Sequence, residues 1–206
     1  MNKKSLTFNE LLGLIIAAVL FFFLIMYPGS KLYAAFTKQE YINSYNKLTA
    51  TIVDIGKSEK TKDSTSTDLV MEEGSGIFAI GKSDKVYISF GESLHYFEKP
   101  VQCEKDKSCI CLCNKGMKQD REKITCNDYI CKSIENIDFG GLTNKQLKLD
   151  PRVSTGYESK GGLMFGRGKM GILIPFVRSK INTVYIQKID NNIVFCFEKS
   201  PCIEEK

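Results

Sequence analysis

Cysteines are the residues of this chain whose type and spacing could most readily support chemistry. There are eight, and six of them fall within 29 residues. An even number of closely spaced cysteines is typical of a disulfide framework in an exported domain. Thiolate pairs with C-x2–4-C spacing are instead typical of structural zinc sites. The eight are Cys103, Cys109, Cys111, Cys113, Cys126, Cys131, Cys196 and Cys202.

Three of these cysteines, Cys109, Cys111 and Cys113, alternate along the chain. In a strand their side chains would point to one face. Neighbours two apart in one strand pair poorly, because a disulfide needs Cα atoms about 5–6 Å apart. We therefore expect three disulfides to the other cysteines of the cluster, and a fourth between Cys196 and Cys202. A zinc or iron–sulfur site is the alternative, but C-x-C-x-C spacing fits it poorly, so no metal or other cofactor is predicted.

Two glycine motifs match nucleotide-binding patterns by sequence alone. Gly76–Ser83 satisfies G-x-x-x-x-G-K-S, and Gly166–Gly171 satisfies G-x-G-x-x-G. Both patterns need a helix directly after the glycines, so that backbone amides point at phosphate. Here Asp84–Phe90 alternates like a strand, and Ile172–Val177 is β-prone and interrupted by proline. We interpret both as chance matches.

Catalytic groups are sparse. His95 is the only histidine, and its place between Leu94 and Tyr96 favours packing or surface exposure over catalysis. No Ser/His/Asp set or paired carboxylates stand out, so the chain is predicted not to be an enzyme. The formal charge of +5 is spread without a Lys/Arg block, which argues against a nucleic-acid partner.

An apolar segment near the N-terminus bears on the compartment. Leu11–Tyr27 is an uninterrupted run of 17 residues, or about 25 Å of helix. With Leu6 and Phe8 it is just long enough to cross a bilayer of about 30 Å. Lys3 and Lys4 precede it, so the N-terminus is predicted to be cytoplasmic and the C-terminal bulk outside. A membrane location agrees with the disulfide expectation.

The residues around this segment form a further pattern. A short basic leader ends in Ser5, and Glu10 would be the fifth residue of a chain that starts at Leu6. This resembles the class III signal of type IV prepilins over the first 30 residues or so. Ser5 stands where the family usually has glycine, Leu6 where phenylalanine is commoner, and Asn9 is an additional polar residue.

The resemblance implies cleavage between Ser5 and Leu6 by a prepilin peptidase. It also implies that Glu10 pairs with the freed α-amino group of a neighbouring subunit and sets the register of bundled helices. Pro28 falls where such helices often carry a bend. Two alternatives remain, an uncleaved anchor and a cleaved secretory signal. In the anchor, Glu10 is simply a carboxylate near a helix N-terminus, where the macrodipole favours it.

The elements downstream follow from periodicity. Apolar residues at alternating steps of four and three predict an amphipathic helix that stops at Gly56. Lys57–Asp68 contains no hydrophobic residue and predicts a linker or exposed loop. Tyr157–Gly171 is glycine-rich and also predicts an exposed loop. The helical stripe consists of Tyr41, Tyr45, Leu48, Ile52 and Ile55.

Short strands are predicted in the remainder of the chain. Asp190–Asn192 lies between the last two predicted strands and strongly indicates a hairpin turn. The predicted strands are Ile77–Ile80, Val86–Phe90, Leu94–Glu98, Ile172–Val177, Thr183–Ile189 and Ile193–Glu198.

The expected fold class is α+β, with a long N-terminal helix followed by a disulfide-stapled antiparallel β-rich head. The expected parts are a leader (1–5), a transmembrane helix (6–30), an amphipathic stalk helix (31–56), a polar linker (57–75) and a β-rich extracytoplasmic domain (76–206). The expected function is that of a pilin-like or pseudopilin-like membrane-anchored subunit of a surface filament or secretion apparatus. Its partners would be membrane lipid and copies of itself. The alternative is an uncleaved single-pass protein that presents a cysteine-rich binding or adhesion ectodomain.

Overall fold

A computed structural model describes residues 8–60, 62–90, 93–114, 116–141, 157–167 and 180–197. These residues contain one helix and thirteen strands. The chain divides into two compact units, Met1–Ile42 and Asn43–Lys206. The second unit holds all the described strands.

The helix α1 spans Phe8–Lys57. Its side chains are described for Leu11–Phe22 and again from Gln39 onward. The helix ends one residue after Gly56, as expected from the low helix propensity of glycine. The five apolar residues of the predicted stripe are buried, in keeping with their helical spacing.

The strands form three sheets in the second unit. In sheet order these are β1-β12-β13-β9, β10-β3-β4-β7-β6 and β11-β2-β5-β8. Most neighbouring strands are antiparallel, but β13 pairs with β9 and β4 pairs with β7 in parallel. The bounds are β1 (Lys62–Val70), β2 (Ser75–Ile80), β3 (Lys85–Phe90), β4 (Ser93–Glu98), β5 (Ser108–Cys113), β6 (Lys118–Asp120), β7 (Lys123–Thr125), β8 (Tyr129–Ile134), β9 (Asp138–Phe139), β10 (Tyr157–Lys160), β11 (Gly162–Arg167), β12 (Ile181–Ile189) and β13 (Asn192–Cys196).

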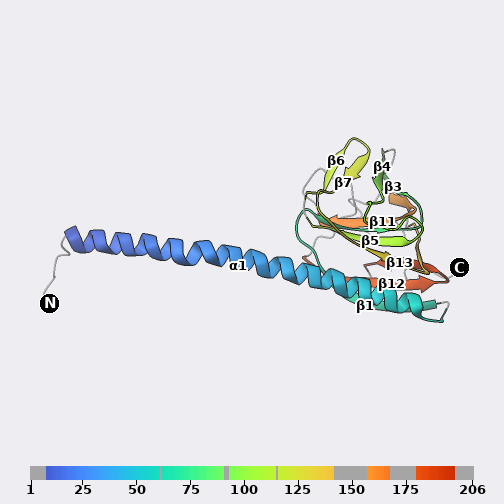
Figure 1. The fold of residues 1–206 in the computed structure, drawn as a ribbon, viewed down its shortest axis with the longest axis horizontal. Coiled ribbons are helices and arrows are strands. Elements are labelled where there is room, and N and C mark those ends of the chain that lie inside the picture. Colours follow the sequence, from blue (N-terminus) through green and yellow to red (C-terminus); the bar gives the residue numbers. More distant parts are fainter. Residues whose placement is uncertain are drawn as a thin grey trace. The chain divides into compact units, whose positions relative to one another are not determined.

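The sheet β11-β2-β5-β8 forms the centre of this unit. Every residue of β2 and β5 is buried. Their sequences, SGIFAI and SCICLC, are continuous small or apolar runs without polar alternation, the pattern of a strand covered on both faces. Figure 1 shows β5 and β11 between β3 and β4 on one side and β12 and β13 on the other. The central sheet therefore supplies core surface to both of its neighbours.

The expected fold class, α+β with a transmembrane N-terminal helix, is wrong. Strands dominate the described residues, which makes this part of the chain mostly β. Within the same residues, α1 included, no helical stretch combines the length and the apolarity needed to cross a bilayer. The head was expected to be antiparallel, and among the described strand pairs two are parallel and the others antiparallel.

The polar segment Lys57–Asp68, predicted as a linker or exposed loop, instead contributes most of β1. This strand pairs along its whole length with β12, from Lys62 opposite Ile189 to Val70 opposite Ile181. The backbone of its serine and threonine residues is paired in this ladder, and the side chains of Thr67 and Leu69 are buried. A strand at a sheet edge with mostly exposed side chains needs no hydrophobic alternation.

The glycine-rich segment Tyr157–Gly171 was also predicted as an exposed loop, but it contains β10 and β11. Gly161 and Gly162 have φ angles of 77° and 144° and make the turn between these strands, a conformation that suits glycine. The predicted hairpin is confirmed, since β12 and β13 are joined through Asp190, whose φ is 54°. The predicted strand Ile172–Val177 lies outside the described residues.

Candidate functional site

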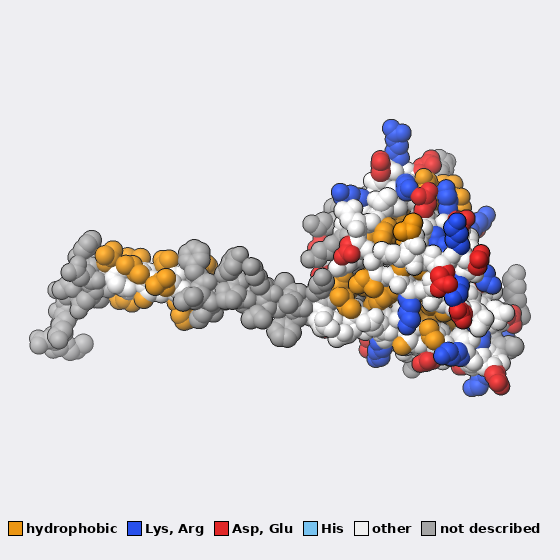
Figure 2. Space-filling model, viewed as in Figure 1, with side chains coloured by type: hydrophobic (Ala, Val, Ile, Leu, Met, Phe, Trp, Pro, Cys, Tyr) orange, Lys and Arg blue, Asp and Glu red, His pale blue; other side chains and the backbone are white. Residues whose placement is uncertain are grey.

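The N-terminal stretch of α1 is the first candidate site. Nine large apolar side chains between Leu11 and Phe22 are about half exposed, from 47% at Leu12 to 66% at Phe21. At 100° per residue they point in all directions around the helix. Figure 2 shows apolar side chains covering this stretch, whereas the visible face of the second unit intersperses charges of both signs. A contiguous exposed apolar surface of this kind is typical of an interaction site.

The residues predicted for processing and assembly lie just before this stretch. Ser5 and Leu6 are outside the described residues. Glu10 lies in the first turn of α1, where the structure describes its backbone. The cleavage site and the role of the Glu10 carboxylate therefore stay predictions.

The cysteines form the second candidate site. Three disulfides join pairs of cysteines within the described residues, namely Cys103–Cys109, Cys111–Cys131 and Cys113–Cys126. Each cysteine of β5 bonds to Cys103, Cys126 or Cys131. This confirms the prediction that alternating cysteines of one strand pair with cysteines outside it. The Cys196–Cys202 pairing stays a prediction, since Cys202 lies outside the described residues.

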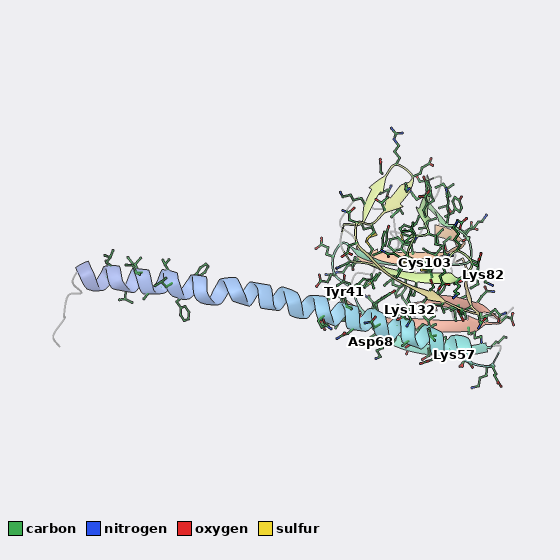
Figure 3. The ribbon with its side chains drawn as sticks, in the orientation of Figure 1. Tyr41, Lys57, Asp68, Lys82, Cys103 and Lys132 are labelled. Atoms are coloured by element: carbon green, nitrogen blue, oxygen red, sulfur yellow. A yellow bond between two sulfur atoms is a disulfide. The ribbon has the colours of Figure 1, made fainter. Side chains whose placement is uncertain are left out.

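The backbone explains which cysteines meet. Cys111 and Cys131 are directly opposite in the β5–β8 ladder, with Cα atoms 4.1 Å apart, close to the spacing of a non-hydrogen-bonded antiparallel pair. Cys103 lies in the loop between β4 and β5, beside β5 (Figure 3). Its N–H donates to the Pro100 carbonyl in a tight turn. The three bridges therefore tie two loops and one strand to β5.

Two of these disulfides lie against each other. The Sγ atom of Cys111 is 3.5 Å from that of Cys103 and 3.7 Å from that of Cys109. The four Sγ atoms of Cys103, Cys109, Cys111 and Cys131 all lie within 4.8 Å of one another. Cys131 is partly exposed, and the other three cysteines are buried. Spacing in the sequence did not reveal this group, because its members come from a loop and two strands.

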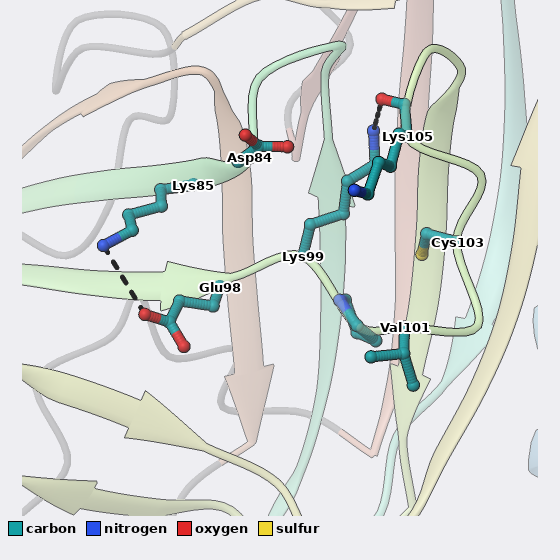
Figure 4. Close-up of a pocket in the computed structure, with 8 residues that line it drawn as sticks. Asp84, Lys85, Glu98, Lys99, Val101, Cys103 and Lys105 are labelled. Atoms are coloured by element: carbon teal, nitrogen blue, oxygen red, sulfur yellow. Dashed lines mark hydrogen bonds and ion pairs between the residues drawn. The ribbon is translucent and has the colours of Figure 1, made fainter.

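A pocket of about 400 Å³ lies at the loop that carries Cys103, one member of this cluster (Figure 4). Cys103 lines it together with three lysines, Lys85, Lys99 and Lys105. Lys99 Nζ donates to the carbonyl oxygens of Lys107 at 2.6 Å and Lys105 at 2.9 Å, which fixes the loop that carries Cys103. Burial lowers the pKa of Lys99, although the nearby carboxylates of acidic residues oppose this shift. Sequence reasoning missed this pocket, since Lys99 carries no local motif.

An ion-pair network borders the same pocket. Glu98 accepts from Lys123 Nζ at 2.5 Å and lies 3.5 Å from Lys85 Nζ. The hydrogen bond from Lys123 is the main cause that lowers the pKa of Glu98. Lys85 Nζ also lies 4.8 Å from the centre of the Tyr96 ring. The charged groups are all partly exposed, so the network contributes little to stability.

The G-x-x-x-x-G-K-S match is not a phosphate site in this fold. Its residues form β2 and a turn that leads into β3, without a following helix. The Lys82 N–H, which would face phosphate, donates to Asp138 Oδ1 at 3.0 Å. The same oxygen accepts from Phe139 N–H at 2.9 Å and from the Ser108 hydroxyl at 3.1 Å. A carboxylate therefore already holds the place where an anion would bind.

His95 is a core residue of β4, opposite Ile88 of β3. It is 5% exposed, and neither ring nitrogen has a hydrogen-bond partner within the described part of the chain. This buried position opposite an apolar side chain fits the expected packing role.

Comparison with known proteins adds no assignment. No protein-family model matches the chain, and no curated protein or solved structure is detectably similar to it.

Proposed function

We propose that this chain is a pilin-like structural subunit, processed between Ser5 and Leu6, that assembles through its N-terminal helix and displays a disulfide-bonded β head. Copies of the chain and membrane lipid are the proposed partners of the helix. The proposed place of assembly is the membrane, with the head outside. The observation that carries the proposal is the exposed apolar surface of Leu11–Phe22.

Covering this apolar surface is energetically favourable. Burying apolar surface contributes about 25 cal/mol per Å². Nine half-exposed side chains therefore provide a large favourable free energy for association with a partner that covers them. Because these side chains surround the helix, one flat partner could not cover them. A bundle of like helices or a lipid environment covers a helix from all sides. The described strands, by contrast, bury most of their large apolar residues inside the second unit, with Tyr87, Leu94 and Ile181 as exposed exceptions.

Glu10 gives the proposal its specificity. A carboxylate in the first turn of an apolar helix requires a cationic partner when water is excluded. Cleavage before Leu6 creates such a partner, the α-amino group of the next subunit. Pairing of these two groups would select one axial register among many that apolar packing alone would permit.

The N-terminus of the protein purified from native membranes tests processing. Mass spectrometry should find a chain that starts at Leu6. A chain that starts at Met1 or Asn2 would contradict the proposal and favour the second candidate, an uncleaved membrane protein whose head binds a ligand. The pocket at Lys99 is the observation that favours that candidate.

The role of Glu10 has a separate test. Glu10→Ala should abolish assembly into sedimentable filaments or cross-linked oligomers, while the protein stays in the membrane fraction. Asp54→Ala is the matched control, since Asp54 is an exposed carboxylate of the same helix. Equal assembly of the two variants would contradict the register role.

A further inference from the structure

The four-sulfur cluster has a geometry that two separate disulfides do not require. Its members belong to two bonds, Cys103–Cys109 and Cys111–Cys131. Yet the non-bonded contacts from Cys111 to Cys103 and Cys109 are 3.5 Å and 3.7 Å. All four sulfur atoms lie within 4.8 Å of one another.

These distances match those of a tetrahedral metal centre. Zinc binds thiolate sulfur at about 2.3 Å, which places the sulfurs of a four-thiolate site about 3.8 Å from one another. The two contacts of Cys111 are already close to this value. The two bonded pairs would need to separate, and the sulfur of Cys131 lies within 4.8 Å of those of Cys103 and Cys109. Soft thiolate donors without oxygen ligands select zinc over magnesium or calcium.

The fold holds most of the ligands in place. Cys109 and Cys111 lie on one face of β5, and Cys131 is opposite Cys111 on β8. Cys103 comes from the loop that Lys99 fixes through two carbonyl hydrogen bonds. The third disulfide, Cys113–Cys126, lies outside the cluster. The site therefore has four defined ligands and a natural internal control.

The surroundings supply access and charge. The pocket gives a reductant or a metal ion access to Cys103, the one member of the cluster that lines it. A zinc ion bound by four thiolates carries a net negative charge. Lys99 and Lys105 at the same pocket provide cationic groups that favour thiolates.

We propose that reduction of these two disulfides converts the cluster into a zinc site with four cysteine ligands. A dithiol is the reductant. Each disulfide takes two electrons and two protons from one dithiol, which itself becomes a disulfide. The four thiols then lose four protons as they bind Zn²⁺. The head would thus be cross-linked at one place in two alternative ways. Disulfides join the four cysteines in the oxidised protein, and a zinc ion joins them in the reduced protein. This inference does not depend on the proposed assembly function.

Cobalt provides the first test, because tetrahedral cobalt thiolates absorb visible light. The full-length protein is reduced with dithiothreitol without oxygen, freed of reductant and titrated with Co²⁺. We expect one Co²⁺ per chain, ligand-field bands of tetrahedral sulfur coordination, and displacement by one equivalent of Zn²⁺. Absence of these bands, or equal binding by the urea-unfolded chain, would overturn the proposal.

Variants locate the ligands. Cys111→Ser should weaken cobalt binding at least tenfold. The control is Cys113→Ser combined with Cys126→Ser, which should bind as the wild type does. Because the reductant opens the third disulfide as well, this control differs from the reduced wild type only by two hydroxyls in place of thiols. Equal losses in both variants would refute the assignment.

A measurement on the unaltered chain guards against misfolded variants. X-ray absorption at the zinc edge of the reduced, zinc-loaded protein should give four sulfur ligands at about 2.3 Å. A shell with nitrogen or oxygen ligands would overturn the four-cysteine assignment. Circular dichroism of the same sample should retain the strand signal of the oxidised protein.

Discussion

Two stretches of the same helix treat their apolar residues in opposite ways. Between Leu11 and Phe22 the large apolar side chains surround the helix and are exposed. Between Asn43 and Lys57 they form a single stripe, and Tyr45, Leu48 and Ile52 are buried. The difference teaches that periodicity, rather than hydrophobicity, decides whether a helix finds its partner within its own chain. A stripe fits one surface of a folded unit, whereas an apolar circumference does not.

Truncation of one leucine in each stretch provides the strongest test of this comparison. Leu48 is 0% exposed and Leu14 is 59% exposed. Leu48→Ala should lower the free energy of unfolding of the head by about 2–5 kcal/mol, through lost burial and a cavity. Leu14→Ala should leave it unchanged. Urea denaturation in mild detergent, followed by tyrosine fluorescence because the chain has no tryptophan, measures both, and equal effects would contradict the comparison.

Removal of a disulfide tests whether the head is stable by its own cross-links. The Cys113–Cys126 bond joins cysteines 13 residues apart. Replacement of both cysteines by alanine should lower the free energy of unfolding by about 3 kcal/mol, mainly because the unfolded chain gains entropy. The same denaturation experiment measures it. A loss below about 1 kcal/mol would mean that this disulfide contributes little to the stability of the head.

A single hydroxyl sharpens the description of the buried stripe. The Tyr45 hydroxyl donates to the Ile110 carbonyl of β5 at 2.9 Å. Tyr45→Phe should lower the free energy of unfolding by about 1 kcal/mol, since a buried carbonyl loses its additional donor. Tyr87→Phe, at a position 41% exposed, is the matched control and should change little. Equal behaviour of the two would show that this bond does not anchor the helix.

Alkaline titration has the smallest expected effect. Burial raises the pKa of Tyr129 to about 12, although its hydrogen bond from the Cys126 N–H opposes the shift. Burial also raises the pKa of Tyr45. The stability from these neutral phenols is lost as pH rises from about 10, the pKa of a free phenol, through about 12, because the unfolded chain releases its protons first. Some of the nine tyrosines should therefore form phenolate at higher pH in the folded protein than in urea. Coincident titration curves would contradict the burial of Tyr45 and Tyr129.

The sequence predicted elements whose signals are local. The apolar run of β2, the hairpin at Asp190 and the one-sided cysteines of β5 each follow from a few neighbouring residues. The disulfide partners of β5 followed as a set, because alternation excluded pairing within the strand. Their individual connectivity required the register of β8 against β5.

Elements that depend on distant partners were missed. The polar strand β1 has no hydrophobic signal of its own and forms because β12 offers a complete ladder. The strands β10 and β11 were predicted as a loop because glycines usually indicate a turn. Glycine also permits the close approach of strands, which is how these residues are used here. The pocket at Lys99 was missed for a related reason, because its lining comes from the ends of β3 and β4 and the following loop.

The pairing of β1 with β12 has a consequence for biosynthesis. The Asp68 carboxylate accepts a hydrogen bond at 2.8 Å from Thr183, which is 115 residues further along the chain. At roughly 10 residues per second a ribosome needs on the order of ten seconds to deliver that partner. During this delay β1 is an unpaired edge, the kind of segment that nucleates aggregation. The lysine, aspartate, serine and threonine residues of β1 keep this segment hydrated before β12 is synthesised. The polar composition that made the strand hard to predict therefore also protects the nascent chain from aggregation.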